Sequence, residues 1–143
     1  MSDHLDSVAQ YIENTVGALT IGVNLFIGFI PQKRPDGTAP PDDSTIVLEA
    51  AGGGLEFDLI DRADKMVQVI TRSKDYITAK EDAFTIFDLF HGNSGLYLPP
   101  FEHASGRDYV AMTIEANSLP MPVGEDDANR WRFSTNYIVR IRE

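Results

Sequence analysis

With 143 residues, 43% of them hydrophobic and 10% aromatic, the chain has the size and composition of one compact domain with a buried core. Its 12 lysines and arginines against 22 aspartates and glutamates give a formal net charge of −10, which disfavours nucleic-acid binding by the surface as a whole. No cysteine is present, so disulfides and thiolate metal sites are excluded, and a cytosolic protein is favoured.

The N-terminal region predicts a helix and then a long strand. The segment MSDHLDSVAQ is acidic and polar, unlike a secretory signal, and Asp3 is placed to cap a helix that Gly17 ends. Alternating apolar residues over 19–30 predict the strand. The apolar stretch around it is shorter than the roughly 20 residues that cross a bilayer, so we expect no membrane contact. The apolar positions of the helix are Leu5, Val8, Ala9, Ile12 and Val16.

A proline-rich loop follows the predicted strand. The segment PQKRPDGTAPPDD, residues 31–43, has no regular apolar pattern and carries a turn signal at Pro35-Asp36-Gly37. It is too polar and too kinked to join a sheet. We expect an exposed, mobile loop that is suited to contact another protein and become ordered there.

The middle of the chain predicts two strands and a second helix. Residues 44–51 and 64–73 have strand patterns, and the three glycines at 52–54 indicate a bulge or a flexible turn. Ser73 is placed to cap a helix that Gly92 ends. Apolar and aromatic residues recur along this helix at Tyr76, Ala79, Ala83, Phe84, Phe87 and Phe90.

The C-terminal part predicts three more strands, at residues 94–101, 108–117 and 131–142. The last one alternates, apart from Ile138, between an apolar and a polar face. A solvated face is the simplest interpretation of its arginines. The apolar face holds Trp131, Phe133, Thr135, Tyr137, Val139 and Ile141, and the polar face holds Arg130, Arg132, Ser134, Asn136, Arg140 and Arg142.

This order of elements predicts a single α+β domain over residues 1–143, with both helices packed on one face of a mainly antiparallel sheet. The apolar face of the last strand should then pack against the second helix. In particular, we expect Trp131, Phe133, Phe84 and Phe87 to be largely buried.

No residue pattern indicates catalysis. His4, His91 and His103 are too widely spaced for a metal site. The run HASGRD contains His103, Ser105 and Asp108, but it lacks the strand-to-helix nucleophile elbow of a hydrolase. We therefore expect a protein that is not an enzyme.

No pattern indicates a metal or a cofactor either. The three glycines lack the lysine and hydroxyl residue of a phosphate-binding loop. The acidic runs at 42–43 and 125–127 lack the alternating ligands of a calcium loop, so solvated turns are the simpler interpretation.

Three segments together carry a resemblance. They are the N-terminal helix with the following strand and GFIP, then VQVITRSKDYITAKEDAFTIFDLFHG, and finally YVAMTIEANSLPMPVGEDDANRWRFSTNYIVRIRE. In order and spacing they resemble the tail terminator and minor capsid proteins of long-tailed bacteriophages across nearly the whole chain. The family's strand-ending arginine and helix-starting tyrosine correspond to Arg72 and Tyr76. Its acidic D-x-x-x-R turn corresponds to Asp126 and Arg130, and its aromatic last strand corresponds to Phe133, Asn136 and Tyr137.

The resemblance implies a structural virion protein of the tail or neck, assembled in the host cytoplasm. It implies a homo-oligomer, a hexameric ring, that caps the tail tube protein, stops its growth and presents a surface to the head-tail connector protein. DNA would pass through the channel only as cargo, and an acidic lining would let it slide. The loop KRPDGTAPPDD and the three glycines depart from the family pattern.

A closed ring also predicts where the subunits touch. Each subunit must offer two different, complementary surfaces, because the contact is heterologous. We expect the arginine face of the last strand to meet a neighbour's acidic loop. The expected interface residues are Lys33, Arg34, Asp42, Asp43, Asp126, Asp127, Arg130, Arg132, Arg140 and Arg142.

Alternatives to a tail terminator stay open. One is another neck or head-tail connector completion protein, which would differ in its attachment point. A second is a small nucleic-acid-binding or partner-binding module that uses the arginine strand and would be retained on DNA at low salt. An enzyme would need a convergent polar pocket.

Overall fold

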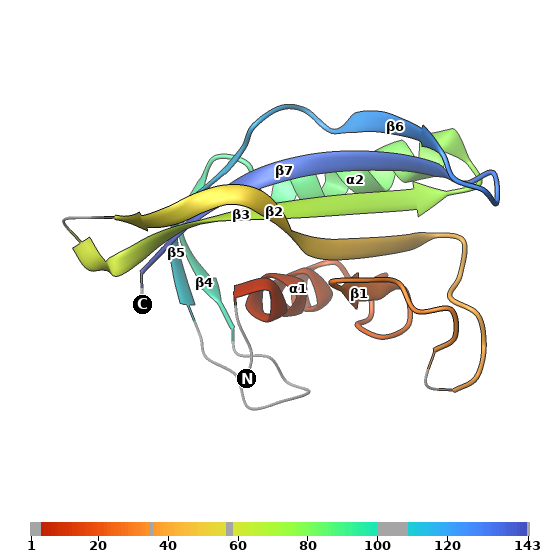
Figure 1. The fold of residues 1–143 in the computed structure, drawn as a ribbon, viewed down its shortest axis with the longest axis horizontal. Helices are drawn as coiled ribbons and strands as arrows, with labels where there is room; N and C mark the ends of the chain where they lie inside the picture. Colours follow the sequence, from red (N-terminus) through yellow and green to blue (C-terminus); the bar gives the residue numbers. More distant parts are fainter. Residues whose placement is uncertain (1–3, 35, 57–58, 100–108, 143) are drawn as a thin grey trace.

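The computed structural model describes residues 4–34, 36–56, 59–99 and 109–142. The elements are α1 (His4–Thr15), β1 (Leu25–Ile27), β2 (Ser44–Glu56), β3 (Leu59–Ser73), α2 (Tyr76–Phe90), β4 (Asn93–Leu98), β5 (Tyr109–Ala116), β6 (Met121–Glu125) and β7 (Trp131–Arg142). The strands form one seven-stranded sheet in the order β1-β2-β3-β7-β5-β4, with β6 also paired to β7. Only β1 and β2 pair in parallel among these strands. The predicted α+β class is confirmed (Figure 1).

The long strands β3 and β7 form the centre of the sheet (Figure 1). They pair without a break from Arg62–Arg142 to Ser73–Trp131. Odd-numbered side chains of β7 from Phe133 to Ile141 are buried, which confirms the alternation read from the sequence. The even-numbered face from Arg132 to Arg140 is half-buried, so it is less open to water than a solvated strand face would be.

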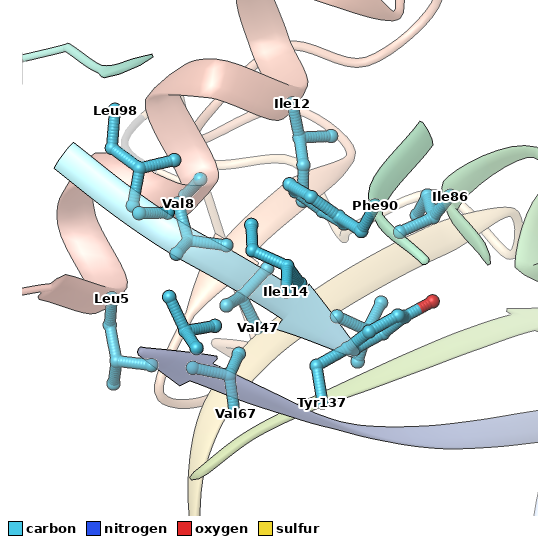
Figure 2. Close-up of a cluster of buried hydrophobic side chains, with 14 of the residues drawn as sticks. Leu5, Val8, Ile12, Val47, Val67, Ile86, Phe90, Leu98, Ile114 and Tyr137 are labelled. Atoms are coloured by element: carbon cyan, nitrogen blue, oxygen red, sulfur yellow. The ribbon is translucent and has the colours of Figure 1, made fainter. Parts of the chain in front are cut away.

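Both helices pack on the odd-numbered face and enclose one main core (Figure 2). Phe90 of α2 lies between the rings of Tyr11 and Tyr137, at centroid distances of 5.8 and 5.6 Å. Val8 and Ile12 of α1 complete this side of the core, and both are buried. Because α1 and α2 share this cluster with β3 and β7, the helices and the sheet stabilise one another.

The buried stripe of α2 differs from the predicted one. Phe84 and Phe87 are only half-buried, and Phe87 stacks on His91 at 4.8 Å. Ala79, Ala83 and Phe90 are buried as predicted, and Ile86 is buried with them in place of the two phenylalanines. The small alanines leave room for Phe133 of β7, which is buried with them as predicted, whereas Trp131 is half-buried. The aromatic contacts to the start of β7 come from Tyr76, whose ring lies 5.3 Å from Trp131 and 5.1 Å from Phe133.

The predicted long strand over 19–30 is wrong, because only Leu25–Ile27 pair as a strand. A turn precedes β1, in which the N–H groups of Val23, Asn24 and Leu25 all donate to the Thr20 carbonyl. The Asn24 side chain accepts from the Thr20 N–H at 2.7 Å and donates to the Ala18 carbonyl. Gly22 and Gly28 have φ of 86° and 83°, so local turn chemistry overrides the apolar alternation.

Two helix caps also bear on the predictions. The N-cap of α2 is Asp75 rather than Ser73, because the Asp75 carboxylate accepts from the Ile77 N–H and the Thr78 hydroxyl. Ser73 accepts from the Asp75 N–H and so holds the cap residue itself. The predicted cap Asp3 lies outside the described residues.

The remaining differences concern strand lengths and one missed strand. β2 and β3 continue into the glycine region, and the predicted bulge is present as a register shift between Glu49 and Gly53. β6 was not predicted because Pro120 and Pro122 indicate a loop. It pairs with β7 alone, through Met121–Ser134 and Pro122–Phe133, and so forms an edge.

The burial of α2 predicts unequal costs for two matched substitutions. Phe90→Ala should lower the free energy of unfolding by about 3–5 kcal/mol, because a buried ring leaves a cavity. Phe87→Ala, on the outer side of the same helix, should lower it by only about 1–2 kcal/mol. Urea titrations of both variants measure this difference, and equal losses would contradict the assigned helix face.

Candidate partner interface

The turn between β6 and β7 is built around Asp126. One carboxylate oxygen accepts from the backbone N–H groups of Ala128 and Arg130, at 2.9 and 3.0 Å. The other accepts from Nε of Arg130 at 2.8 Å. Asn129 adopts a positive φ of 59°, which asparagine tolerates in turns. The predicted acidic turn is therefore a closed hydrogen-bonded unit.

These contacts also set the protonation of Asp126. Desolvation is the largest single effect and on its own raises the pKa of this carboxyl. The hydrogen bonds from the Arg130 and Ala128 N–H groups, with the Arg130 guanidinium, outweigh it and hold the pKa below the usual 3.8. Both oxygens of Asp126 are thus charged and already engaged at neutral pH.

Arg130 links this turn to the end of the proline-rich loop. Its Nη1 lies 3.7 Å from the Asp42 carboxylate, which lies 3.6 Å from Nζ of Lys74 on its other side. Asp42 and Lys74 are exposed enough that these pairs contribute little energy on their own. They do place the loop end, the turn and the start of α2 next to each other.

Arg72, at the end of β3, is the most deeply buried cation of the described chain. Its side chain is 9% exposed and its Nη2 donates to the Pro41 carbonyl at 3.1 Å. Desolvation, followed by the nearby Arg130 charge, lowers its pKa from the usual value, while Asp126 and Asp42 act in the opposite direction. An arginine keeps its charge through such shifts, so β3 ends in a buried cation.

Arg72 pairs across the sheet with Arg132 of β7. Like charges at directly opposed positions destabilise a sheet. In both residues the Nε group is buried and has no hydrogen-bond partner. The two side chains line a pocket of about 180 Å³ together with Asp126 and three isoleucines, Ile30, Ile46 and Ile70. This pocket, the arginine pocket, opens on the sheet face opposite the helices.

A second pocket, the acidic pocket, lies on the helix side of the same sheet. It measures about 230 Å³ and is lined by Asp43 and Asp82 with hydroxyl groups of Thr45, Thr78 and Thr85. Desolvation, followed by the charges of Asp43 and Glu81, raises the pKa of Asp82. Within the described part of the chain, no ion pair neutralises these three carboxylates.

Exposed apolar side chains mark the sheet edges. Leu119, just before β6, and Met121 and Val123 within it are exposed in alternate positions, with exposed fractions of 59, 57 and 48%. Beside β1, a largely apolar groove of about 420 Å³ is lined by residues that include Leu25, Phe29 and Lys33. Phe29 is 69% exposed there. Neither surface was predicted, because exposure along an edge depends on which strands pair.

Other kinds of site have little support in the described residues. No three histidine or acidic side chains among them gather in a way that could hold a metal ion. Neither described helix combines the length and apolar character needed to cross a bilayer. The candidate triad His103, Ser105 and Asp108 lies outside the described residues.

Comparison with protein families decides the assignment. The family model of the bacteriophage tail terminator protein matches residues 14–143, which is nearly the whole chain. The chain belongs to this family. A search of curated proteins found no match. A tail terminator is a structural component of the virion tail, so the resemblance read from the sequence is confirmed.

The structure of this tail terminator gathers some of the ten predicted interface residues and separates others. Four of them, Asp42, Asp126, Arg130 and Arg132, lie together around the arginine pocket. Asp43 lines the acidic pocket on the opposite face. Asp127 is exposed in the turn, and the side chain of Arg142 lies outside the described set. The sequence assigned Arg72 no interface role, because its pairing with Arg132 depends on strand register.

Arg140 lies apart, at the other end of β7. Its guanidinium lies 3.7 Å from Asp64 and 3.6 Å from Glu115, and it donates to Thr113 at 3.3 Å. These partners belong to the neighbouring strands β3 and β5. Arg140 is therefore neutralised within its own subunit, in contrast to Arg132.

Lys33 and Arg34 lie near the tip of the proline-rich loop. The Arg34 guanidinium donates to the Thr38 hydroxyl at 2.6 Å, and the Arg34 N–H donates to the Thr38 carbonyl. The Asp36 carboxylate accepts from the hydroxyl and from the backbone N–H of Thr38. The hydroxyl contact is the main reason that the Asp36 pKa lies below its usual value. The described part of the tip is exposed, as predicted, and its internal hydrogen bonds give it a defined shape.

The role of Asp126 in the tail terminator can be tested by pH. Because folding lowers its pKa, its charge-dependent stabilisation is present above the unfolded pKa and is lost as pH falls through the lower folded pKa. Asp126→Ala should lower the free energy of unfolding at pH 7 by about 1–3 kcal/mol. The deficit should shrink in urea titrations below about pH 4. Asp127→Ala, one residue along, is the control and should barely change the free energy of unfolding. A deficit for Asp126→Ala that does not change with pH would contradict this role.

Proposed function

We propose that this chain forms a ring of identical subunits that caps the tail tube, stops its growth and presents its other side to the head-tail connector. The family match over residues 14–143 is the observation that carries the proposal. In this proposal the subunits assemble in the host cytoplasm, a hexamer is the expected ring, and DNA passes through its channel as cargo.

The charge distribution supports a heterologous contact. A ring joins two different surfaces of the same subunit at every contact. The arginine pocket and the acidic pocket lie on opposite faces of the sheet, and within the described residues Arg72, Arg132, Asp43 and Asp82 form no ion pair. Such complementary faces favour association between copies over association of like faces.

The exposed edges support contacts with further proteins. The apolar row on β6 and the groove beside β1 expose large side chains that a free monomer has no need to expose. Exposed strand edges also offer unpaired backbone groups to a neighbouring chain. A subunit that must contact a neighbour, a tube and a connector needs several such surfaces.

Electron microscopy tests the proposal in two settings. Phage assembled without this chain should make overlong or headless tails, and the added protein should appear as rings at tube ends. Protein that binds the head but not the tube would instead identify a connector completion protein. Retention on duplex DNA at low salt without any ring would favour the nucleic-acid-binding alternative.

A charge placed in the apolar row should block assembly without unfolding the subunit. Met121→Asp adds the charge at an exposed position, so the free energy of unfolding should change by no more than about 0.5 kcal/mol. Rings on tail tubes, counted in micrographs, should be lost. Ser118→Asp adds the same charge at an exposed polar position and should leave ring formation intact. Normal rings with Met121→Asp would show that the apolar row lies outside the contacts.

The proline-rich loop can be divided into two parts that should behave differently. Replacing residues 33–39 by a Gly-Ser linker should barely change the thermal midpoint, because Arg34, Asp36 and Thr38 bond mainly to one another. It should impair joining to the tube or the connector, measured as infectious particles. Replacing residues 40–43 should lower stability, because the Pro41 carbonyl accepts from Arg72 and Ser44. Full infectivity without residues 33–39 would exclude the loop tip as a contact.

A further inference from the structure

We propose that Arg72 and Arg132 form a binding site for a carboxylate side chain that a second copy of this chain supplies. The inference rests on the proposed ring and names the chemistry of one of its contacts. The ligand of the arginine pocket is an aspartate or glutamate side chain. It comes from the acidic pocket and the adjacent first half of α2 in the neighbouring subunit.

The first argument is unsatisfied hydrogen bonding. Arg72 is nine-tenths buried, lines the pocket and leaves its Nε without a partner. Arg132, directly opposite on β7, leaves its Nε in the same state. Buried donors without partners cost stability, and the cost is larger for charged groups. A ligand with acceptor oxygens would remove this cost at both arginines.

The second argument is charge. Asp126 is the only acidic residue among those that line the pocket in the described structure. Both of its oxygens are occupied by Arg130 and by backbone N–H groups. Neither oxygen bonds to the Nε groups of Arg72 and Arg132. Two arginines against one aspartate leave the pocket lining with an excess of positive charge, in a chain whose net charge is −10.

The shape of the pocket favours a carboxylate over a nucleic-acid phosphate. A volume of about 180 Å³, walled in part by Ile30, Ile46 and Ile70, admits a single side-chain head. A planar carboxylate can accept from two guanidinium groups at once. A duplex presents its phosphates on a convex, highly charged surface, which the net negative charge of this chain repels.

The acidic pocket identifies a second copy as the source. Asp43, Glu81 and Asp82 lie together with no neutralising cation in the described structure, and their mutual repulsion contributes to the raised pKa of Asp82. They face away from the arginine pocket, so one subunit cannot join the two sites. A head-to-tail neighbour can, and each contact would then relieve an unpaired charge on both sides.

The assembly experiment compares two arginines on the same strand. Arg132→Gln should raise the protein concentration needed for ring formation at least tenfold, measured by sedimentation and micrographs. Arg140→Gln, whose guanidinium has partners within the subunit, should raise it less than threefold. Urea titration checks that both variants fold. Equal effects of the two variants, or wild-type assembly of Arg132→Gln, would overturn the proposal.

Charge exchange tests the partner. Asp82→Arg and Arg132→Asp should each abolish ring formation, and the double variant should restore it, because the ion pair then forms with reversed polarity. If Glu81→Arg, but not Asp82→Arg, is rescued by Arg132→Asp, the second-copy proposal holds with Glu81 as the ligand. If Arg132→Asp rescues none of the charge reversals at Asp43, Glu81 and Asp82, the assignment to a second copy is overturned.

A monomer experiment separates the site from the ring. In the dilute wild-type subunit, titration with succinate should shift the Nε–H NMR signals of Arg72 and Arg132 while leaving that of Arg140 unchanged. This outcome supports the carboxylate site even if no ring forms. In that case the proposed function is wrong and the proposed binding site still holds. Shifts with inorganic phosphate or duplex DNA but none with succinate would overturn the carboxylate assignment.

Discussion

The pairing of β3 with β7 is the interaction on which the other features of this tail terminator depend. Its register is unbroken, and side chains alternate along both strands, so a slip of one residue would turn every buried side chain toward solvent. The core formed with α1 and α2 needs Tyr137 and Val139 on the helix side. The same register fixes Arg72 opposite Arg132 on the other side. Stability of the core and placement of the arginine pocket therefore follow from one constraint.

That constraint carries an energetic conflict. The core gains from burying aromatic and branched residues, whereas the opposite face holds two like charges in cross-strand contact and two buried donors without partners. A pair of uncharged side chains would suit an isolated sheet better. Local conflicts of this kind are expected at functional sites, where the missing contacts are supplied by a ligand or a partner. We propose the same for the conflict at Arg72 and Arg132, whereas the charge of Arg140 is resolved within the subunit.

The sequence predicted the features that depend on local periodicity and missed those that depend on pairing. The alternation of β7 and the class of the fold were read correctly, because burial on one face leaves a direct pattern. The strand over 19–30 failed because Gly22 and Asn24 form a turn inside an apolar run. The stripe of α2 was correct at Ala79, Ala83 and Phe90 but wrong at Phe84 and Phe87, because these neighbouring aromatic residues obscured the burial of Ile86. Of the two arginines in the arginine pocket, the sequence-based prediction named Arg132 and not Arg72, since the register between distant strands leaves no mark in either segment.

The two pockets also bear on why a terminator subunit can remain separate until it is needed. With a net charge of −10, free subunits repel one another at long range, and salt screens this repulsion over distances of about 10 Å. A buried arginine pair is screened much less, and in the proposed contact it would act only when a carboxylate enters the pocket. In the proposed ring, association would be weak in free solution and would become favourable where a tube end holds two subunits side by side, because subunits held together meet at a raised effective concentration. A balance of diffuse repulsion and one local attraction would restrict ring closure to the place where the tail must stop growing.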